Sequence, residues 1–453
     1  MITLLLILNS IAALWGGVSL FRKTRNYAVF VFEIVFVMFF VVRPAAVVYF
    51  QLLSFDLKRY GVDNSDIATY LLSGFVFISL FHWIVPKLYR RRRLFSDRFF
   101  LVCDFDRVNV RRLLIVALFF AAATYLANVF KFGSLTYFLQ NIDSFAADVS
   151  LEGGHWYVQI LSWVILFPIV AMLGKAAKRE PAKLLAALVA AMIVYNILAK
   201  PSTRTETIAL FVAVIVYAFS VEKLKFNVWT IGISTGCVLL LLVFLNGVRQ
   251  GNISAGAASF AIVPVLSAAL QNVGPADNGM ILVDYLRHHS WLYFRYLVPS
   301  LLPTSIIPGA IFPLKPNIDI EGALTYTLFG FKLDPQQYHA GGTLTFTVPI
   351  AGYADLGLLG TAVAAVLFAF LFAMLLRGWR SPSTSARFMT LFYLIFISAG
   401  FRLSVESLMA TVYWLVAATA SLHFFSTFAL FRSRMSDAAA RNLSGSAGTT
   451  AAG

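Results

Sequence analysis

Charged side chains are scarce in this sequence. Asp, Glu, Lys and Arg make up only 13% of its 453 residues, whereas a soluble domain carries about 25%. Hydrophobic residues reach 60%, and so few charges would not cover the surface of a soluble fold. The composition therefore excludes a soluble enzyme, a disordered protein and a coiled coil. It predicts an all-α, polytopic membrane protein.

Cysteines and the motifs of common enzyme sites are also scarce. Cys103 falls near a predicted cytoplasmic face and Cys237 falls within a predicted span, so we expect neither a disulfide nor a cysteine metal site. His288 and His289 are adjacent, and on a helix they would not face one metal together. The sequence has no metal-ligand spacing, P-loop, G-x-S-x-G or dinucleotide fingerprint. We therefore expect no metal, no cofactor and no energy supply from a cytoplasmic nucleotide.

Long apolar runs are abundant. A membrane-spanning helix needs about 20 apolar residues, and on this basis the sequence predicts about 11 transmembrane helices. The first has no basic residue ahead of it, which favours a retained span over a cleaved signal peptide. The predicted spans are 1–20, 27–50, 67–89, 113–130, 156–173, 184–199, 206–221, 228–247, 348–376, 388–401 and 407–431.

The positive charge is unevenly distributed. The formal net charge is +15, and 24 of the 36 basic residues lie in six segments that alternate along the chain: 21–26, 87–112, 174–183, 222–226, 377–387 and the tail from 432. Cytoplasmic loops carry an excess of Lys and Arg. The pattern predicts a multi-pass membrane protein with its N-terminus outside and its C-terminus in the cytoplasm. The net charge then reflects topology and not nucleic-acid binding.

These boundaries predict four regions. Residues 1–247 hold transmembrane helices 1–8, 248–342 form a large periplasmic loop with interfacial helices, 343–431 hold helices 9–11, and 432–453 form a disordered cytoplasmic tail. The loop contains 8 of the 15 prolines, and loops of this length are either functional or disordered. Its aromatic residues favour a folded loop, and the short apolar run 257–270 predicts an interfacial or re-entrant helix within it.

Several basic residues are not explained by topology, and Arg204 is the clearest of them. Thr203 and Glu206 form a T-x-x-E capping box after Pro201, so a helix is predicted to begin here at the outer face. A cation in the first turn opposes the helix dipole. A bound anion would compensate it, and the alternative is an ion pair with a nearby carboxylate.

Four more cations fall at the predicted outer face. Arg402 repeats the pattern of Arg204, with an i,i+4 pair to Glu406 as its alternative. Arg249 ends a span, where the helix dipole alone favours a cation. Arg43 lies in the second span and must face protein or water, or else snorkel to the headgroups. Lys315 lies between two prolines, as a solvated loop charge or a fixed phosphate contact.

Two residues at the same face are candidate bases. Asp355 lies near the outer end of the ninth span, and the alternative is a solvated carboxylate. His339 lies in the loop just before two glycines, and the alternative is a surface histidine. Together with the cations and the aromatic loop, these residues suit a lipid-linked saccharide that carries a phosphate or pyrophosphate.

The C-terminal half resembles the Wzy-type O-antigen and exopolysaccharide repeat-unit polymerases. The resemblance rests on four segments, which are Lys200–Arg204 before a span, Asn246–Arg249 at the end of the next, the proline-rich Pro299–Pro316, and Gly341–Gly360. It implies a GT-C-like fold and a metal-independent glycosyl transfer with polyprenyl pyrophosphate as the leaving group. Residues 1–180 match that family only in hydropathy.

The resemblance also implies roles and partners. The base for the acceptor hydroxyl would be His339 or Asp355. A polyprenyl-pyrophosphate-linked oligosaccharide and membrane lipid would be the small-molecule partners, and a chain-length regulator and a flippase the protein partners. An O-antigen ligase, a flippase or transporter of lipid-linked saccharide without catalysis, or an accessory assembly protein stays open as an alternative. The pyrophosphate-binding residues would be Arg204, Arg249, Arg402, Arg43 and Lys315.

Overall fold

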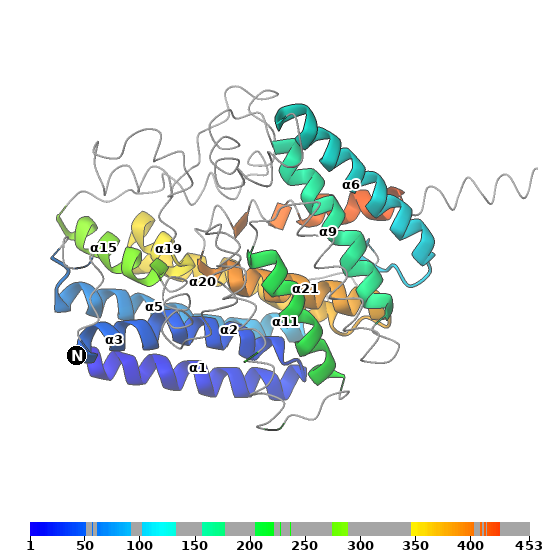
Figure 1. Cartoon of the computed structure of the whole chain (residues 1–453). Coiled ribbons are helices and arrows are strands. Elements are labelled where there is room, and N and C mark those ends of the chain that lie inside the picture. The colour runs from blue at the N-terminus through cyan, green and yellow to red at the C-terminus, as the bar shows by residue number, and fades with distance from the viewer. Residues whose placement is uncertain are drawn as a thin grey trace, which may run out of the picture.

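The computed structural model describes residues 1–50, 57, 61–91, 102–132, 156–176, 204–221, 227, 236, 274–288, 346–402, 408–409, 412–413 and 415–425. These parts of the chain are helical, and they contain no strand (Figure 1). In the N-terminal half the helices are α1 (Ile2–Thr24), α2 (Ala28–Val37), the π-helix η1 (Met38–Val42), α3 (Arg43–Phe50), α5 (Asn64–Arg90), α6 (Val110–Phe132), α9 (Trp156–Ala176) and α11 (Arg204–Ser220). They continue with α15 (Gly274–His288), α19 (Val348–Leu356), α20 (Leu358–Gly378), α21 (Thr384–Ala399) and the 3-10 turn η6 (Gly400–Arg402).

Four helices among the described residues are long and apolar enough to cross a membrane. They are α1, the continuous run α2–η1–α3, α5 and α20. The predicted helical fold is therefore confirmed for the described residues, and the four apolar helices indicate a membrane-embedded protein, whereas the predicted number of 11 spans stays a prediction. Helices α6, α9, α11 and α21 also fall on predicted spans. The predicted span 184–199 and the predicted tail lie outside the described residues.

The predicted span 348–376 is wrong as a single helix. Gly357 has φ +63° and ψ −143°, a conformation that residues with a side chain rarely adopt, and the chain breaks there into α19 and α20. Helix α19 folds back on the first turn of α20, since Thr361 Oγ1 donates to the Pro349 carbonyl at 3.0 Å. A Cβ added to Gly360 would lie 1.9 Å from the Gly352 carbonyl oxygen. The glycines of this segment therefore permit a helical hairpin, and only α20 is long enough to span.

Phenylalanine rings fill the centre of the bundle. Phe401, just after α21, has ring centroids of Phe32 and Phe77 at 5.4 and 5.3 Å, and Phe368 of α20 lies 5.7 Å away. These rings are all fully or almost fully buried. Aromatic pairs at such distances stabilise a core beyond their buried area, and here they join α2, α5, α20 and the end of α21.

One end of the bundle collects the segments that the charge pattern placed on one face. Arg377 donates to the Arg91 carbonyl at 3.0 Å, and Ser383 Oγ donates to Asp104 Oδ1 at 2.7 Å. Near the start of α2, the Tyr27 amide donates to Ser220 Oγ at 3.3 Å. We call this the basic end, defined by residues 22–27, 87–91, 104–112, 220–221 and 377–387.

The opposite end carries α3, the start of α5, α15 and α19, and we call it the loop end. In Figure 1 it lies at the left, with the N-terminus, and the helices α1, α5 and α20 run from it toward the basic end. Among the described residues, α1, the run α2–η1–α3, α5 and α20 therefore connect the two ends (Figure 1), and the alternation of the rest of the chain stays a prediction. Which end faces the cytoplasm stays a prediction.

Candidate functional site

Helix α15 is the described part of the predicted periplasmic loop, and it packs on the loop end of the bundle. It lies against α5, α19 and η1. A Cβ on Gly279 would lie 2.6 Å from the Tyr70 ring, so the glycine allows α15 to approach α5 closely. Asp277 lies in the first turn and Arg287 in the last, and both charges are favourable for the helix dipole. The loop is therefore folded at least over this helix.

A buried ion pair fastens the first turn of α15 to the bundle. Arg43 donates through Nε to Asp277 Oδ1 and through Nη2 to Asp277 Oδ2, both at 2.7 Å. The two residues are only 7% and 8% exposed. Paired, parallel N–H···O bonds of this length are the strong form of an arginine–carboxylate contact. Of the alternatives for Arg43, the structure therefore favours the one in which it faces protein.

The π-helix η1 leads directly into Arg43 and also contacts Tyr70 of α5. The Arg43 amide bonds to the Met38 carbonyl, five residues back. The next residue, Pro44, has no N–H to donate to the Phe39 carbonyl. That carbonyl instead accepts from the Tyr70 hydroxyl of α5 at 3.3 Å. Single π-turns occur frequently at functional sites. Here the carbonyl that Pro44 leaves without an amide partner accepts a hydrogen bond from α5.

A second, more exposed ionic contact holds the last turn of α15. Arg287 Nη2 lies 3.1 Å from Asp63 Oδ2, and Arg287 Nη1 lies 3.4 Å from Asp66 Oδ1. Asp63 also caps α5, and its side chain accepts from the Ser65 amide at 2.7 Å. The Ser65 hydroxyl, and after it Arg287, hold the pKa of Asp63 well below its usual range. The same carboxylate raises the pKa of Arg287.

Asp355, a candidate base, lies in α19 and is 2% exposed. It is therefore buried and not solvated at a membrane edge, which removes one of its two alternatives. Helix α19 contacts both α15 and α5, so Asp355 belongs to the same group of helices as the Arg43–Asp277 pair. Burial in a bundle that also excludes water is the setting in which a carboxylate can act as a base.

The remaining predicted site residues are placed only in part. Arg204 is the first residue of α11 and Arg402 is the last of η6, but the described residues do not include their side chains. Arg249, Lys315 and His339 lie outside the described residues, as do the predicted helix 257–270 and the loop aromatics. Of the five predicted cations, the structure therefore describes the side chain of Arg43 alone, and it places a carboxylate beside it.

One buried ionic pair was missed by the sequence analysis. His82 Nε2 of α5 lies 3.2 Å from Glu33 Oε1 of α2, with side chains 11% and 6% exposed. Among the described residues neither group makes a well-aligned hydrogen bond. Gly16 and Gly17 of α1 cover the pair, since a Cβ there would lie 2.1 Å from the His82 ring and 2.7 Å from Glu33 Cγ. The signal was present, because ionisable residues inside predicted spans are rare and are functional candidates.

Comparisons with known proteins identify no relative. No protein-family model matches the sequence, and no curated protein and no solved structure matches it. The resemblance to the Wzy-type polymerases therefore rests on the four sequence segments alone. The structure describes parts of two of them, which are Arg204 and residues 346–360.

Proposed function

We propose that this protein polymerises lipid-linked oligosaccharide repeat units at the periplasmic face of a bacterial inner membrane. In the proposed reaction the hydroxyl oxygen of a new repeat unit attacks the anomeric carbon of the growing glycan. The bond from that carbon to the pyrophosphate oxygen breaks, and polyprenyl pyrophosphate leaves. The hydroxyl proton passes to a base, which is Asp355 or His339.

The observation that supports this proposal most is the anchoring of α15 at the loop end. A transferase of this kind needs its loop residues held at the membrane surface, within a fraction of an ångström of a productive geometry. The buried Arg43–Asp277 pair and the Arg287 contacts hold one helix of the 95-residue loop against α5 and α19. Asp355 lies in α19 and is therefore positioned by rigid elements and not by a free loop.

Arg43 takes a different part in this proposal from the other cations. Its Nε and Nη2 are bonded to Asp277, so we assign it as a positioning residue for α15. Arg204, Arg249, Arg402 and Lys315 are the proposed contacts for the leaving pyrophosphate, whose developing charge must be stabilised in the transition state. In this assignment the loop end combines an arginine that holds the loop with cations that hold the substrate.

A second candidate function is a flippase or transporter of a lipid-linked saccharide. The Glu33–His82 pair favours it, because paired ionisable groups inside spans occur along proton and substrate pathways of transporters. Gly16 and Gly17 of α1 pack directly over this pair, and its side chains are only 11% and 6% exposed. We therefore keep the polymerase as the first proposal.

The test reconstitutes the purified protein in vesicles with repeat units linked to polyprenyl pyrophosphate. Mass spectrometry of the products distinguishes the candidates: several repeat units on one lipid indicate a polymerase, and transfer to an added lipid A core indicates a ligase. Movement of unextended substrate across the vesicle, without lengthening, indicates a flippase and would overturn the proposal.

Substitutions at Arg204 test the proposed anion site. Arg204→Ala should lower the rate of lengthening roughly 10- to 100-fold, which corresponds to a lost charged hydrogen bond of about 1.5–3 kcal/mol. Arg204→Lys should restore only part of the rate, because an ammonium lacks the planar fork of a guanidinium. Normal product length with Arg204→Ala, at wild-type protein level, would place the pyrophosphate away from the start of α11.

Substitutions at the two candidate bases test the proton acceptor. The true base should lose about 10²- to 10⁴-fold in rate when it is replaced, by Asp355→Asn or by His339→Gln. The other variant should keep a rate close to wild type and serves as the control. Near-wild-type rates for both variants would exclude both residues as the base.

A further inference from the structure

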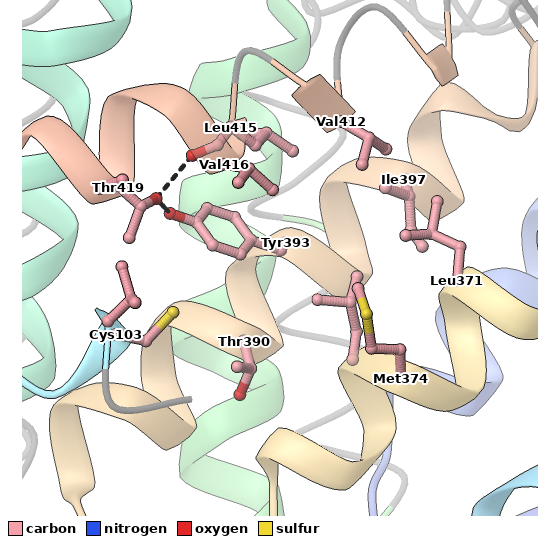
Figure 2. Close-up of a pocket in the computed structure, with 13 residues that line it drawn as sticks. Cys103, Leu371, Met374, Thr390, Tyr393, Ile397, Val412, Leu415, Val416 and Thr419 are labelled. Atoms are coloured by element: carbon pink, nitrogen blue, oxygen red, sulfur yellow. Dashed lines mark hydrogen bonds between the residues drawn. The ribbon is translucent and has the colours of Figure 1, made fainter. Parts of the chain in front are cut away.

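A partly open apolar cavity lies inside the bundle, away from the loop end. Its volume is about 90 Å³, and it is enclosed by α20, α21, the helical residues 415–425 and the segment at Val102 and Cys103 (Figure 2). Figure 2 shows Cys103 on one side of it and Leu371 and Ile397 on the other, with the Tyr393 ring between. Nothing in the proposed reaction uses this cavity.

The described walls of the cavity expose almost no polar atoms, and their hydroxyl groups are bonded to other partners. Thr390 Oγ1 donates to the Ala386 carbonyl at 2.8 Å, and Thr419 Oγ1 donates to the Leu415 carbonyl at 2.6 Å. The Tyr393 hydroxyl is hydrogen-bonded to Thr419. A buried water needs two to four polar partners, and apolar cavities without them stay dry and take up apolar molecules. The cavity is therefore suited to hydrocarbon.

The cavity opens beside exposed apolar side chains of the helical residues 415–425. Val416 is 45% exposed and Ala420, one turn further along the same helix, is exposed as well, whereas the opposite walls at Thr390 and Leu371 are buried. Exposed apolar side chains of a membrane-embedded helix meet the hydrocarbon of the bilayer. A chain from that hydrocarbon can therefore enter between Val416 and Ala420 without crossing water.

The end of the bundle nearest to the cavity is positively charged. Arg107 and Arg111 follow the wall residue Cys103 by four and eight residues, and both are exposed. On the other side, Thr390 lies near the start of α21, which begins at the basic end. Basic side chains at the end of a helix bundle attract anionic headgroups. The basic end and the apolar cavity are therefore arranged like the headgroup and the acyl chain of an anionic phospholipid.

We propose that this cavity binds one acyl chain of an anionic phospholipid, with the headgroup among the arginines of the basic end. About 90 Å³ is less than the roughly 150 Å³ apolar cavity that accepts a benzene molecule, so it fits a short length of a linear chain and not a ring system. The site is independent of the proposed polymerase reaction. It would be present whether the protein is a polymerase, a ligase or a flippase.

The experiment uses phosphatidylglycerol that carries a diazirine near the end of one acyl chain, in nanodiscs containing the full-length protein. After irradiation, mass spectrometry locates the labelled peptides. Labels should concentrate on the segments around Tyr393, Val416 and Leu371. Ala420→Phe should lower this labelling roughly tenfold, because the larger side chain fills the mouth and the chain would have to displace it.

A matched variant separates filling of the cavity from a change in the helix. Ala417→Phe places the same side chain on the same helix, at a residue that is not among the described lining residues, and it should keep wild-type labelling. Equal loss in both variants, or labels spread evenly over all lipid-facing helices, would overturn the proposal. Thermal unfolding of both variants confirms that they are folded.

Two further lipids test the identity of the occupant. Phosphatidylcholine with the same photoactivatable chain should label the cavity several-fold less, and equal labelling would remove the role of the headgroup charge. Unlabelled phosphatidylglycerol should compete better than a polyprenyl phosphate at equal concentration. Stronger competition by the polyprenyl phosphate would show that an isoprenoid chain, and not an acyl chain, occupies the cavity, and would overturn the assignment.

Discussion

Two buried ionic pairs in this bundle have similar burial but different geometry. The side chains of Arg43 and Asp277 are 8% and 11% exposed, and those of His82 and Glu33 are 11% and 6% exposed. The first pair makes two aligned hydrogen bonds at 2.7 Å. The second has a single contact at 3.2 Å without good alignment. Burial alone therefore does not say how firmly a pair is held.

The chemistry of the cations sharpens this difference. A guanidinium is always charged in a protein, so Arg43 needs its carboxylate permanently. An imidazole also exists in a neutral form, so His82 does not require a charged partner in the way that a guanidinium does. The first pair is suited to holding a loop helix in place, and the second has neither its paired hydrogen bonds nor its permanent charge.

Removing the charge of Asp277 is expected to have the largest effect. Asp277→Asn keeps the shape of the side chain but removes the carboxylate that accepts from Nε and Nη2 of the buried Arg43 guanidinium. Breaking a buried pair in this way costs about 3–5 kcal/mol, so the thermal midpoint in detergent should fall strongly and α15 should become accessible to protease. Asp284→Asn, at a less buried carboxylate of the same helix, is the control. Equal losses in the two variants would mean that the Arg43 pair does not hold α15.

Adding a methyl group at Gly16, where α1 packs against His82, is expected to have the next largest effect. A Cβ on Gly16 would lie 2.1 Å from the His82 ring, and overpacking of this kind costs about 1–3 kcal/mol. Gly16→Ala should therefore lower the thermal midpoint, whereas Gly236→Ala, with open space around it, should not. The double variant Gly16→Ala/His82→Ala should lose less than the sum of the single variants, because the small side chain removes the clash. Strict additivity would show that Gly16 does not pack on His82.

The hairpin of α19 and α20 and the Arg43 pair show what the sequence could and could not predict. Hydropathy identifies helices because it reports which segments are apolar, and the ends of α1, α5 and α11 agree with the predicted spans within a few residues. The alternation of basic segments predicted the two ends. The apolar stretch continues through Gly357, however, because a glycine changes the backbone conformation without making the segment polar. Hydropathy therefore does not reveal the break between α19 and α20.

The partners of the site residues could not be predicted in the same way. Arg43 and Asp277 are 234 residues apart, and their contact depends on where the loop folds back onto the bundle. Local patterns carry no information on such a distance. The Pro44 π-turn was visible as a proline in a span, but its consequence for Tyr70 requires the packing of α5 against η1. Glu33 and His82 stood in predicted spans, so they were identifiable as candidates but not as a pair.

Removing the charge of Glu33 is expected to have a smaller effect than the same change at Asp277. Glu33→Gln removes a single contact that is not well aligned, and the imidazole left behind has a neutral form, so the loss should be about 1 kcal/mol or less. The matched comparison of Glu33→Gln with Asp277→Asn by thermal unfolding tests the contrast directly. A loss at Glu33 as large as that at Asp277 would mean that His82 keeps its charge in the bundle and that both pairs are permanently ionic.

The exposed contact between Arg287 and Asp63 is expected to have the smallest effect and the clearest dependence on pH. Asp63→Asn keeps a good cap for α5 and removes only the charge. The pKa of Asp63 is lowered in the folded protein, by the Ser65 hydroxyl and then by Arg287. A carboxyl whose folded pKa lies below its unfolded value of about 3.9 contributes stability above that value and loses it as the pH falls through the folded pKa. The small difference in thermal midpoint between wild type and Asp63→Asn should therefore be full at pH 7 and should shrink below about pH 4.

Because the pair is exposed, high salt at pH 7 should reduce the same difference. A difference that is constant from pH 7 to pH 3 would assign the effect to the cap of α5, and Arg287→Gln would then be silent at every pH.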